Sequence, residues 1–182
     1  YRTLLNGDED TDFKFGTITP DSIYVISVNR SRYKEKLAPG VLTLVLSGSG
    51  TTKLSLTDNS KTSATVSYAD AGRVYDIVSG AAGVVYTGSN ATGISTNSGR
   101  YGKMYPDVGI IVLNGEALND SPGSGGGIGL VIDDSTTVSP ANKNVLSGSN
   151  MVVKGKSFTL QSEETVTSSY VFVRVRNSEY NY

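Results

Sequence analysis

The stretch Val41 to Leu46 (Val-Leu-Thr-Leu-Val-Leu) decides the fold class, because leucines occupy every second position. In an extended strand these leucines share one face, and the valines and the threonine share the other. A second run, Ile23 to Val28 (Ile-Tyr-Val-Ile-Ser-Val), is rich in β-branched residues and apolar on both faces. That run predicts a buried central strand.

Further short apolar runs follow along the chain at a spacing of about 8–12 residues. They are Leu54 to Leu56, Thr65 to Tyr68, Val74 to Val78, Val84 to Tyr86, Ile110 to Leu113 and Leu130 to Ile132. Turn residues such as Gly48 and Asp70 separate them. The pattern predicts a mainly β fold, an antiparallel β-sandwich or jelly-roll-like domain with long Gly/Ser-rich loops and little helix. The best helix candidates are Arg32 to Leu37 and Glu116 to Asn119.

The polarity of the chain predicts its domain organisation. Residues 1–20 are polar and acidic, and we expect them to form an exposed N-terminal arm. Residues 21–182 are predicted to form a single β-rich domain. Within it, residues 79–107 are rich in Gly, Ser, Asn and Thr, which predicts a loop-rich excursion with little packing of its own. The chain begins at Tyr1 and ends at Tyr182, just after a strand pattern, so we expect it to be a fragment or a processed piece.

Composition excludes several classes of function. Lys and Arg number 16 against 17 Asp and Glu, a formal net charge of -1, which gives no basis for binding nucleic acid or an anionic membrane. No run approaches the roughly 18 apolar residues of a membrane helix. The chain has no Cys and no His, so it lacks thiolates and the commonest general base and transition-metal ligand. We therefore expect a protein that is not an enzyme and carries no cofactor.

Several short matches to functional motifs fail on their context. The Asp8 to Asp12 run places carboxylates like the start of a calcium loop, but Phe13 and Thr19 stand where that loop needs Gly and Glu. The Lys154 to Ser157 run resembles the end of a phosphate-binding loop, but the residues after it predict a strand where that loop needs a helix. Ser31-Arg32-Tyr33-Lys34 matches the Ser-x-x-Lys of β-lactamase-like enzymes without their buried helix.

Acidic pairs leave a carboxylate enzyme open as a further class. Asp133-Asp134 and Glu163-Glu164 could in principle serve a glycosidase, which needs only two acids. Adjacent residues on a strand point to opposite faces, and both pairs adjoin turn-rich segments. We therefore interpret these pairs as solvated surface charges.

A basic segment follows the first predicted strand. If it stays extended, Arg30, Arg32, Lys34 and Lys36 all face one way and need counter-charges or water. One interpretation is a solvated edge that blocks unwanted strand pairing. Another is a salt-bridged contact with an acidic neighbouring subunit. Contact with nucleic acid is disfavoured, because the chain as a whole is not basic.

The C-terminal region predicts a hairpin between Phe158 to Leu160 and Tyr170 to Arg176. In the second of these strands, alternate valines would face the core. The other face would carry aromatic and basic side chains, and we take it as a candidate interaction surface: Tyr170, Phe172, Arg174 and Arg176.

Several segments together resemble virion structural proteins of T4-like contractile-tailed phages, especially those of marine cyanobacteria. They are Ile23 to Leu37 (Ile-Tyr-Val-Ile-Ser-Val-Asn-Arg-Ser-Arg-Tyr-Lys-Glu-Lys-Leu) with Pro39-Gly40, Tyr105 to Asn114 (Tyr-Pro-Asp-Val-Gly-Ile-Ile-Val-Leu-Asn), and Ser169 to Asn177 (Ser-Tyr-Val-Phe-Val-Arg-Val-Arg-Asn) with Tyr180-Asn181-Tyr182. The resemblance implies a non-enzymatic tail, baseplate or neck component in the virion. Its partners would be other virion proteins and copies of itself.

A second hypothesis is a carbohydrate-binding or host-receptor adhesion module. Sugar sites pair aromatic platforms with polar side chains. Tyr86, Tyr101 and Tyr105, in or beside the predicted loop region, would be the platform candidates. A possible glycan ligand thus remains open alongside the structural role.

Overall fold

The computed structural model describes residues 1–47, 53–63, 65–86, 100–120, 126–129, 157–171 and 174. Its helical elements are α1 (Arg2–Asn6), the 3-10 turn η1 (Arg30–Arg32) and α2 (Gly115–Asn119). Its strands are β1 (Ile23–Ser27), β2 (Lys36–Leu37), β3 (Thr43–Ser47), β4 (Lys53–Asp58), β5 (Ser67–Ala69), β6 (Gly72–Ala81), β7 (Val84–Val85), β8 (Gly102–Tyr105), β9 (Ile110–Asn114), β10 (Ser157–Thr159) and β11 (Ser162–Glu163). The prediction of a mainly antiparallel β fold with little helix is confirmed.

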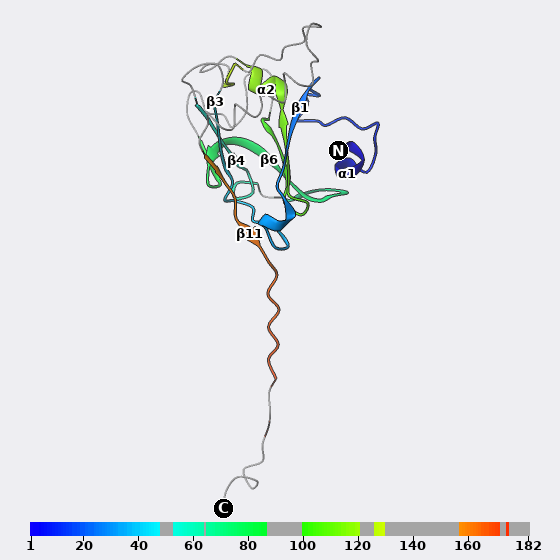
Figure 1. Ribbon diagram of the computed structural model, residues 1–182, viewed down its shortest axis with the longest axis vertical. Helices are drawn as coiled ribbons and strands as arrows, with labels where there is room; N and C mark the ends of the chain where they lie inside the picture. The colour runs from blue at the N-terminus through cyan, green and yellow to red at the C-terminus, as the bar shows by residue number, and fades with distance from the viewer. Residues whose placement is uncertain are drawn as a thin grey trace, which may run out of the picture.

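The strands form one large curled sheet with the order β1-β9-β8-β6-β4-β3-β10, and every neighbouring pair in it is antiparallel. The short strands β5 and β7 both pair with β6, and β11 forms a separate two-stranded sheet with β2. Figure 1 shows β3 and β4 on one side of the curl and β1 on the other. This arrangement is a β-sandwich-like all-β fold.

The alternation at Val41 to Leu46 has the predicted consequence. Leu44 of β3 faces Leu56 of β4, and Leu46 faces Leu54. Leu42, Leu44, Leu46 and Leu56 are all fully buried. The leucine face of this hairpin therefore supplies one wall of the core, which is the main stabilising contribution expected from an alternating strand.

The sheet buries apolar side chains on both of its faces. From β9, Ile111 and Leu113 join the β3 and β4 leucines in the larger cluster, inside the curl. The alternate residues Ile110 and Val112 belong to a second cluster on the opposite face. All five residues of β9 are therefore buried, because both faces of this strand are covered.

The N-terminal segment covers that opposite face, which corrects the interpretation of residues 1–20 as an exposed arm. Leu5 and Phe15 are fully buried and Phe13 nearly so, against Val74, Tyr105 and Ile110. The acidic residues of the segment remain exposed. The polar composition of the segment obscured three large apolar side chains that complete the second cluster.

The run Ile23 to Val28 does form a strand, but its place in the sheet differs from the prediction. Within the described residues, β1 pairs only with β9 and so lies at one end of the sheet. Four of its five residues are half-buried, in contrast to the buried β9. An apolar run that contacts a core cluster on each face had the appearance of a central strand, although β9 is its one partner among the described residues.

The region 79–107 contributes more to the sheet than its composition predicts. β6 continues to Ala81 and pairs with β7, and β8 lies between β6 and β9. The residues of the predicted excursion at 87–99 lie outside the described part of the chain.

The helix predictions had mixed outcomes. The helix predicted at Glu116 to Asn119 is α2, which Asn114 caps by accepting hydrogen bonds from the N–H groups of Glu116 and Ala117. The helix predicted at Arg32 to Leu37 is wrong, because this segment contains the end of η1 and then β2.

Candidate functional site: the C-terminal arm

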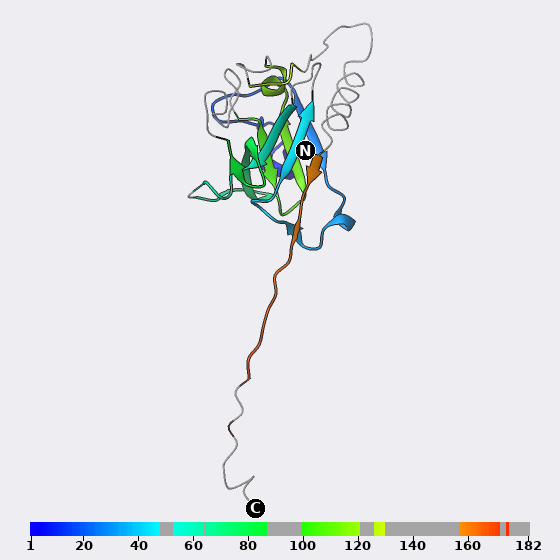
Figure 2. The same ribbon diagram turned by 90° about the vertical axis from the view of Figure 1, so that its left-hand side faces the viewer.

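The last described part of the chain leaves the body of the protein as an extended segment. Phe158 in β10 pairs with Leu44 of β3, and Ser162 in β11 pairs with Leu37 of β2. Beyond β11 the chain runs away from the sheet, and both views show it leaving the body in the same direction (Figures 1 and 2). We call residues 166–171 the C-terminal arm and residues 162–165 its base.

The arm exposes large apolar side chains. Val166 is 78% exposed, Tyr170 85% and Val171 83%. Within the described part of the chain, residues 166–171 form no hydrogen bonds. Fully burying a side chain of this size is worth about 1.5–3 kcal/mol, so these positions have a large unused potential for binding.

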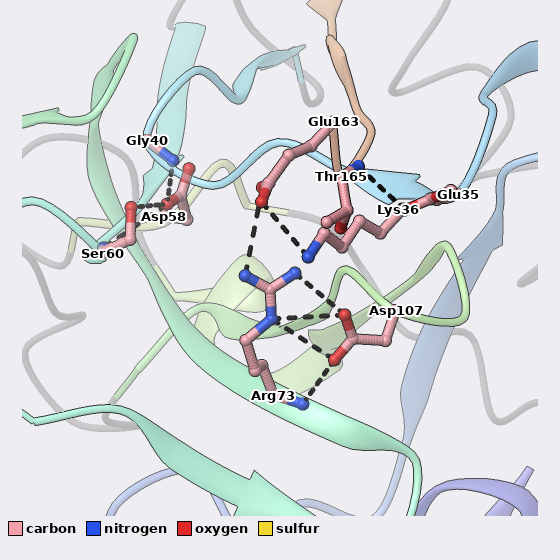
Figure 3. A network of polar contacts seen from close by, with 9 residues as sticks. All are labelled: Glu35, Lys36, Gly40, Asp58, Ser60, Arg73, Asp107, Glu163 and Thr165. Atoms are coloured by element: carbon pink, nitrogen blue, oxygen red, sulfur yellow. Dashed lines mark hydrogen bonds and ion pairs between the residues drawn. The ribbon is translucent and has the colours of Figure 1, made fainter. Parts of the chain in front are cut away.

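The base of the arm is held to the main sheet by ion pairs around Arg73 of β6 (Figure 3). The Glu163 carboxylate lies 3.3 Å from the Lys36 ammonium and 3.9 Å from the Arg73 guanidinium. The same guanidinium donates to Asp107 at 2.9 Å and 3.2 Å. Three segments distant in sequence therefore meet at one arginine.

Burial and hydrogen bonding act in opposite directions on Asp107. Burial alone would raise the pKa of this carboxyl, but the hydrogen bonds from the side chain and backbone of Arg73 outweigh it and lower the pKa. The same contact raises the pKa of Arg73. Both groups are therefore charged near neutral pH, and the Arg73 cation also lies close enough to attract Glu163.

A second set of contacts marks where the base ends. The Lys34 ammonium lies 2.7 Å from Glu164, and the backbone N–H of Thr165 donates to the Glu35 carboxylate at 3.0 Å. That hydrogen bond lowers the pKa of Glu35. Thr165 is the last arm-side residue with a hydrogen bond to the described body, so the arm begins at a defined exit point.

A neighbouring group in Figure 3 is independent of the arm. Asp58, at the end of β4, is fully buried. Its carboxylate accepts a hydrogen bond from the backbone N–H of Gly40 at 2.6 Å and another from the hydroxyl of Ser60. This aspartate fixes the segment before β3 against the turn after β4.

The basic segment does not form the predicted stripe. Arg30 and Arg32 lie in η1, so the strand alternation that would align four cations is absent. The Arg30 guanidinium stacks 4.8 Å from the centre of the Tyr33 ring, and Arg32 is exposed. Lys34 and Lys36 instead pair with acidic residues of the same chain. Two of the four basic residues therefore have their counter-charges within the same chain.

The described residues of the predicted C-terminal hairpin do not form it. Its first strand pairs with β3, and Tyr170 and Val171 lie in the arm with no strand partner among the described residues. Arg174 is exposed and outside any strand. Phe172 and Arg176 lie outside the described residues. The aromatic and basic face remains a prediction as an interaction surface, with Tyr170 and Arg174 exposed as it requires.

The aromatic platform predicted for a glycan is largely internal. Tyr101 and Tyr105 are 2% and 1% exposed, and burial raises the pKa of each hydroxyl to about 12. Tyr86 is the member of this set that is accessible, at 46%. Among the described residues, no three or more acidic side chains are grouped to hold a metal ion.

The residues that hold the base of the arm to the main sheet were not predicted to lie together. Glu163 and Glu164 were interpreted as solvated charges, but they bind Lys36 and Lys34. Arg73 and Asp107 carried no sequence signal, because their pairing depends on β6 and β8 being neighbours. The nearest available signal was the charge complementarity between the basic segment and the later acidic pair.

Comparison of the chain with protein-family models, with curated proteins and with solved structures found no match. None of the described helices is long and apolar enough to cross a membrane.

Proposed function

We propose that this chain is a non-enzymatic structural component of a phage virion, in the tail or baseplate assembly, and that it acts through protein–protein contacts. The observation that carries the proposal is the C-terminal arm, which leaves a firmly held base and presents Val166, Tyr170 and Val171 to solvent. The virion setting rests on the sequence resemblance, and the mode of action rests on the arm.

The shape of the arm favours binding by strand addition. An extended peptide can add to the exposed edge of another sheet, where backbone hydrogen bonds give affinity and alternate side chains give specificity. The arm is already extended and its backbone groups are unpaired within the described chain. Its base is fixed at Thr165, which limits the orientations that the arm can sample before it binds.

Protein mass spectrometry of purified phage particles tests the virion role. We expect the chain in the particles at a fixed copy number relative to other tail proteins. A variant in which Val166, Tyr170 and Val171 are all replaced by Ser should be missing from particles or strongly reduced, although it is expressed and folded. The matched control replaces the exposed Thr167 and Ser168 by Ala. Purified particles that lack the wild-type chain would contradict the proposal.

The carbohydrate-binding alternative has weaker support. Two of its three candidate aromatic residues, Tyr101 and Tyr105, are buried in the core and cannot stack on a sugar. A glycan array checks the remaining possibility: specific binding that is lost in Tyr86→Ala would favour adhesion over a scaffolding role.

A further inference from the structure

The free edge of β1 has the geometry to receive an added strand. Gly115 donates its N–H to the C=O of Ser22 at 3.1 Å, and Val28 donates its N–H to the C=O of Gly109 at 2.9 Å. These bonds flank β1 in its antiparallel register with β9. Backbone N–H and C=O groups alternate in direction along a strand. Ile23, Val25 and Ser27 therefore point their N–H and C=O groups away from β9, toward the opposite edge of β1. Among the described residues, nothing pairs with that edge.

The side chains of β1 also lack full cover. Ile23, Tyr24, Val25 and Ile26 are half-buried, whereas the residues of β9 beside them are all buried. Tyr24 and Ile26 pack on the larger cluster, and Ile23 and Val25 on the second cluster. A strand added at this edge would therefore meet apolar side chains on both faces.

We propose that the C-terminal arm of one copy of this chain adds as an antiparallel strand to the β1 edge of a second copy. This inference rests on the proposed function, because both treat the arm as the contact element, and it names the partner. The arm of the same chain is held at Thr165 and points away from the sheet, so the acceptor edge belongs to another copy (Figures 1 and 2).

One register satisfies the exposed apolar residues of the arm. If Thr167 lies opposite Ser27, then Val166 lies opposite Val28 and Tyr170 opposite Tyr24. In the same register Val171 lies opposite Ile23. All three exposed apolar side chains thus gain an apolar neighbour, and the polar pair Thr167 and Ser27 remains at the surface. A shift of two residues toward the start of β1 would place Tyr170 opposite Ser22 and Val171 opposite Asp21, which removes the match.

Charge favours the same orientation. The antiparallel register brings Arg174 to the start of β1, where Glu116 accepts a hydrogen bond from the backbone N–H of Asp21 at 3.1 Å. Neither the Asp21 carboxylate nor the Glu116 carboxylate forms an ion pair with another described residue. An exposed arginine of the arm would therefore meet two carboxylates that have no ion-pair partner in the described part of the chain.

The contact joins two different surfaces, the arm of one copy and the β1 edge of the next. Such head-to-tail contacts leave a free arm and a free edge at the ends, so they propagate into rings or filaments. We therefore expect association to continue beyond a dimer.

Cysteine cross-linking of the full chain tests the register directly, since the wild-type chain has no Cys. Ser27→Cys and Thr167→Cys are made in separate chains and mixed under mild oxidation. Opposed residues that share hydrogen bonds have Cα atoms about 5.5 Å apart, within the range a disulfide spans. The mixture should yield a covalent dimer that contains one copy of each variant. The control mixes Thr167→Cys with Lys14→Cys, and a yield equal to that control would overturn the register.

Sedimentation velocity of the full chain separates this inference from the proposed function. Ser27→Pro removes an outward N–H from the edge and should weaken self-association by about tenfold or more. Ser27→Ala keeps that N–H and should associate like the wild type. If the triple Ser variant of the arm loses association while Ser27→Pro does not, the arm binds elsewhere; the inference then fails and the proposed function stands. A chain that stays monomeric at all concentrations also overturns the inference, and its presence in particles then decides the proposed function.

Discussion

Arg73 is the residue through which the base of the arm is joined to the main sheet. It lies at the start of β6 and contacts Asp107, which follows β8, and Glu163 in β11. A planar guanidinium suits this position because it can hold one carboxylate with two parallel hydrogen bonds and still contact another. The side chains of Arg73 and Asp107 are 20% and 31% exposed, so solvent screens their attraction less than at a surface pair.

Replacing Arg73 should loosen the base of the arm and destabilise the domain. In Arg73→Gln, the half-buried carboxylate of Asp107 loses its main partner, and we expect the free energy of unfolding to fall by about 1–3 kcal/mol. Urea denaturation monitored by tyrosine fluorescence measures this change. Arg2→Gln is the matched control, because the Arg2 and Asp12 side chains are about half exposed, and it should change stability by less than about 0.5 kcal/mol. Equal changes in the free energy of unfolding for the two substitutions would contradict the role of Arg73 in holding the base of the arm.

The hydrogen bond between Thr165 and Glu35 gives the base a pH dependence. The folded pKa of Glu35 lies below its ordinary value of 4.5, so the contact is complete above that pH and is lost as the pH falls through the lowered folded pKa. In an NMR titration, the Thr165 amide signal should therefore shift with a midpoint below 4.5. The shift should vanish in Glu35→Gln. A midpoint at or above the ordinary value would show that the hydrogen bond does not favour the charged form.

At the scale of the element, the N-terminal segment acts as a cover for one face of the sheet. Leu5, Phe13 and Phe15 belong to the second cluster. They pack on the face of the sheet that carries Ile23 and Val25 of β1 and Ile110 and Val112 of β9. The segment is largely irregular after α1, so no periodic pattern marked it as part of the core. Periodicity predicted β3 and β4 well for the opposite reason, because regular strands repeat their exposure every second residue.

Truncating Phe15 tests this role of the segment. Phe15→Ala should reduce the free energy of unfolding by about 3–5 kcal/mol, because it leaves a cavity in a fully buried site. Lys14→Ala changes the exposed neighbour and should stay within about 0.5 kcal/mol of the wild type. Thermal or urea unfolding measures both. A small effect of Phe15→Ala would mean that the segment is an exposed arm after all.

At the scale of the whole molecule, a curled antiparallel sheet carries an arm that its own body does not use. The sequence allowed the all-β class and the strands of the leucine hairpin to be predicted, because both depend on local alternation. It did not predict strand order, the edge position of β1 or the meeting of Lys36, Arg73 and Glu163, because these depend on contacts between distant segments. Residues 170–176 alternate in sequence like a strand, which is why a hairpin was predicted, but the described residues among them, Tyr170, Val171 and Arg174, lie outside any strand.

Hydrogen exchange of the arm tests the central claim, that residues 166–171 form their contacts with another protein molecule. Their amides should exchange rapidly in the dilute isolated chain, because they have no hydrogen-bond partners within the described chain. In assembled particles the same amides should be strongly protected, while exchange in β3 and β9 stays as slow as before. Equal exchange rates of the arm in the isolated chain and in the particles would contradict the account.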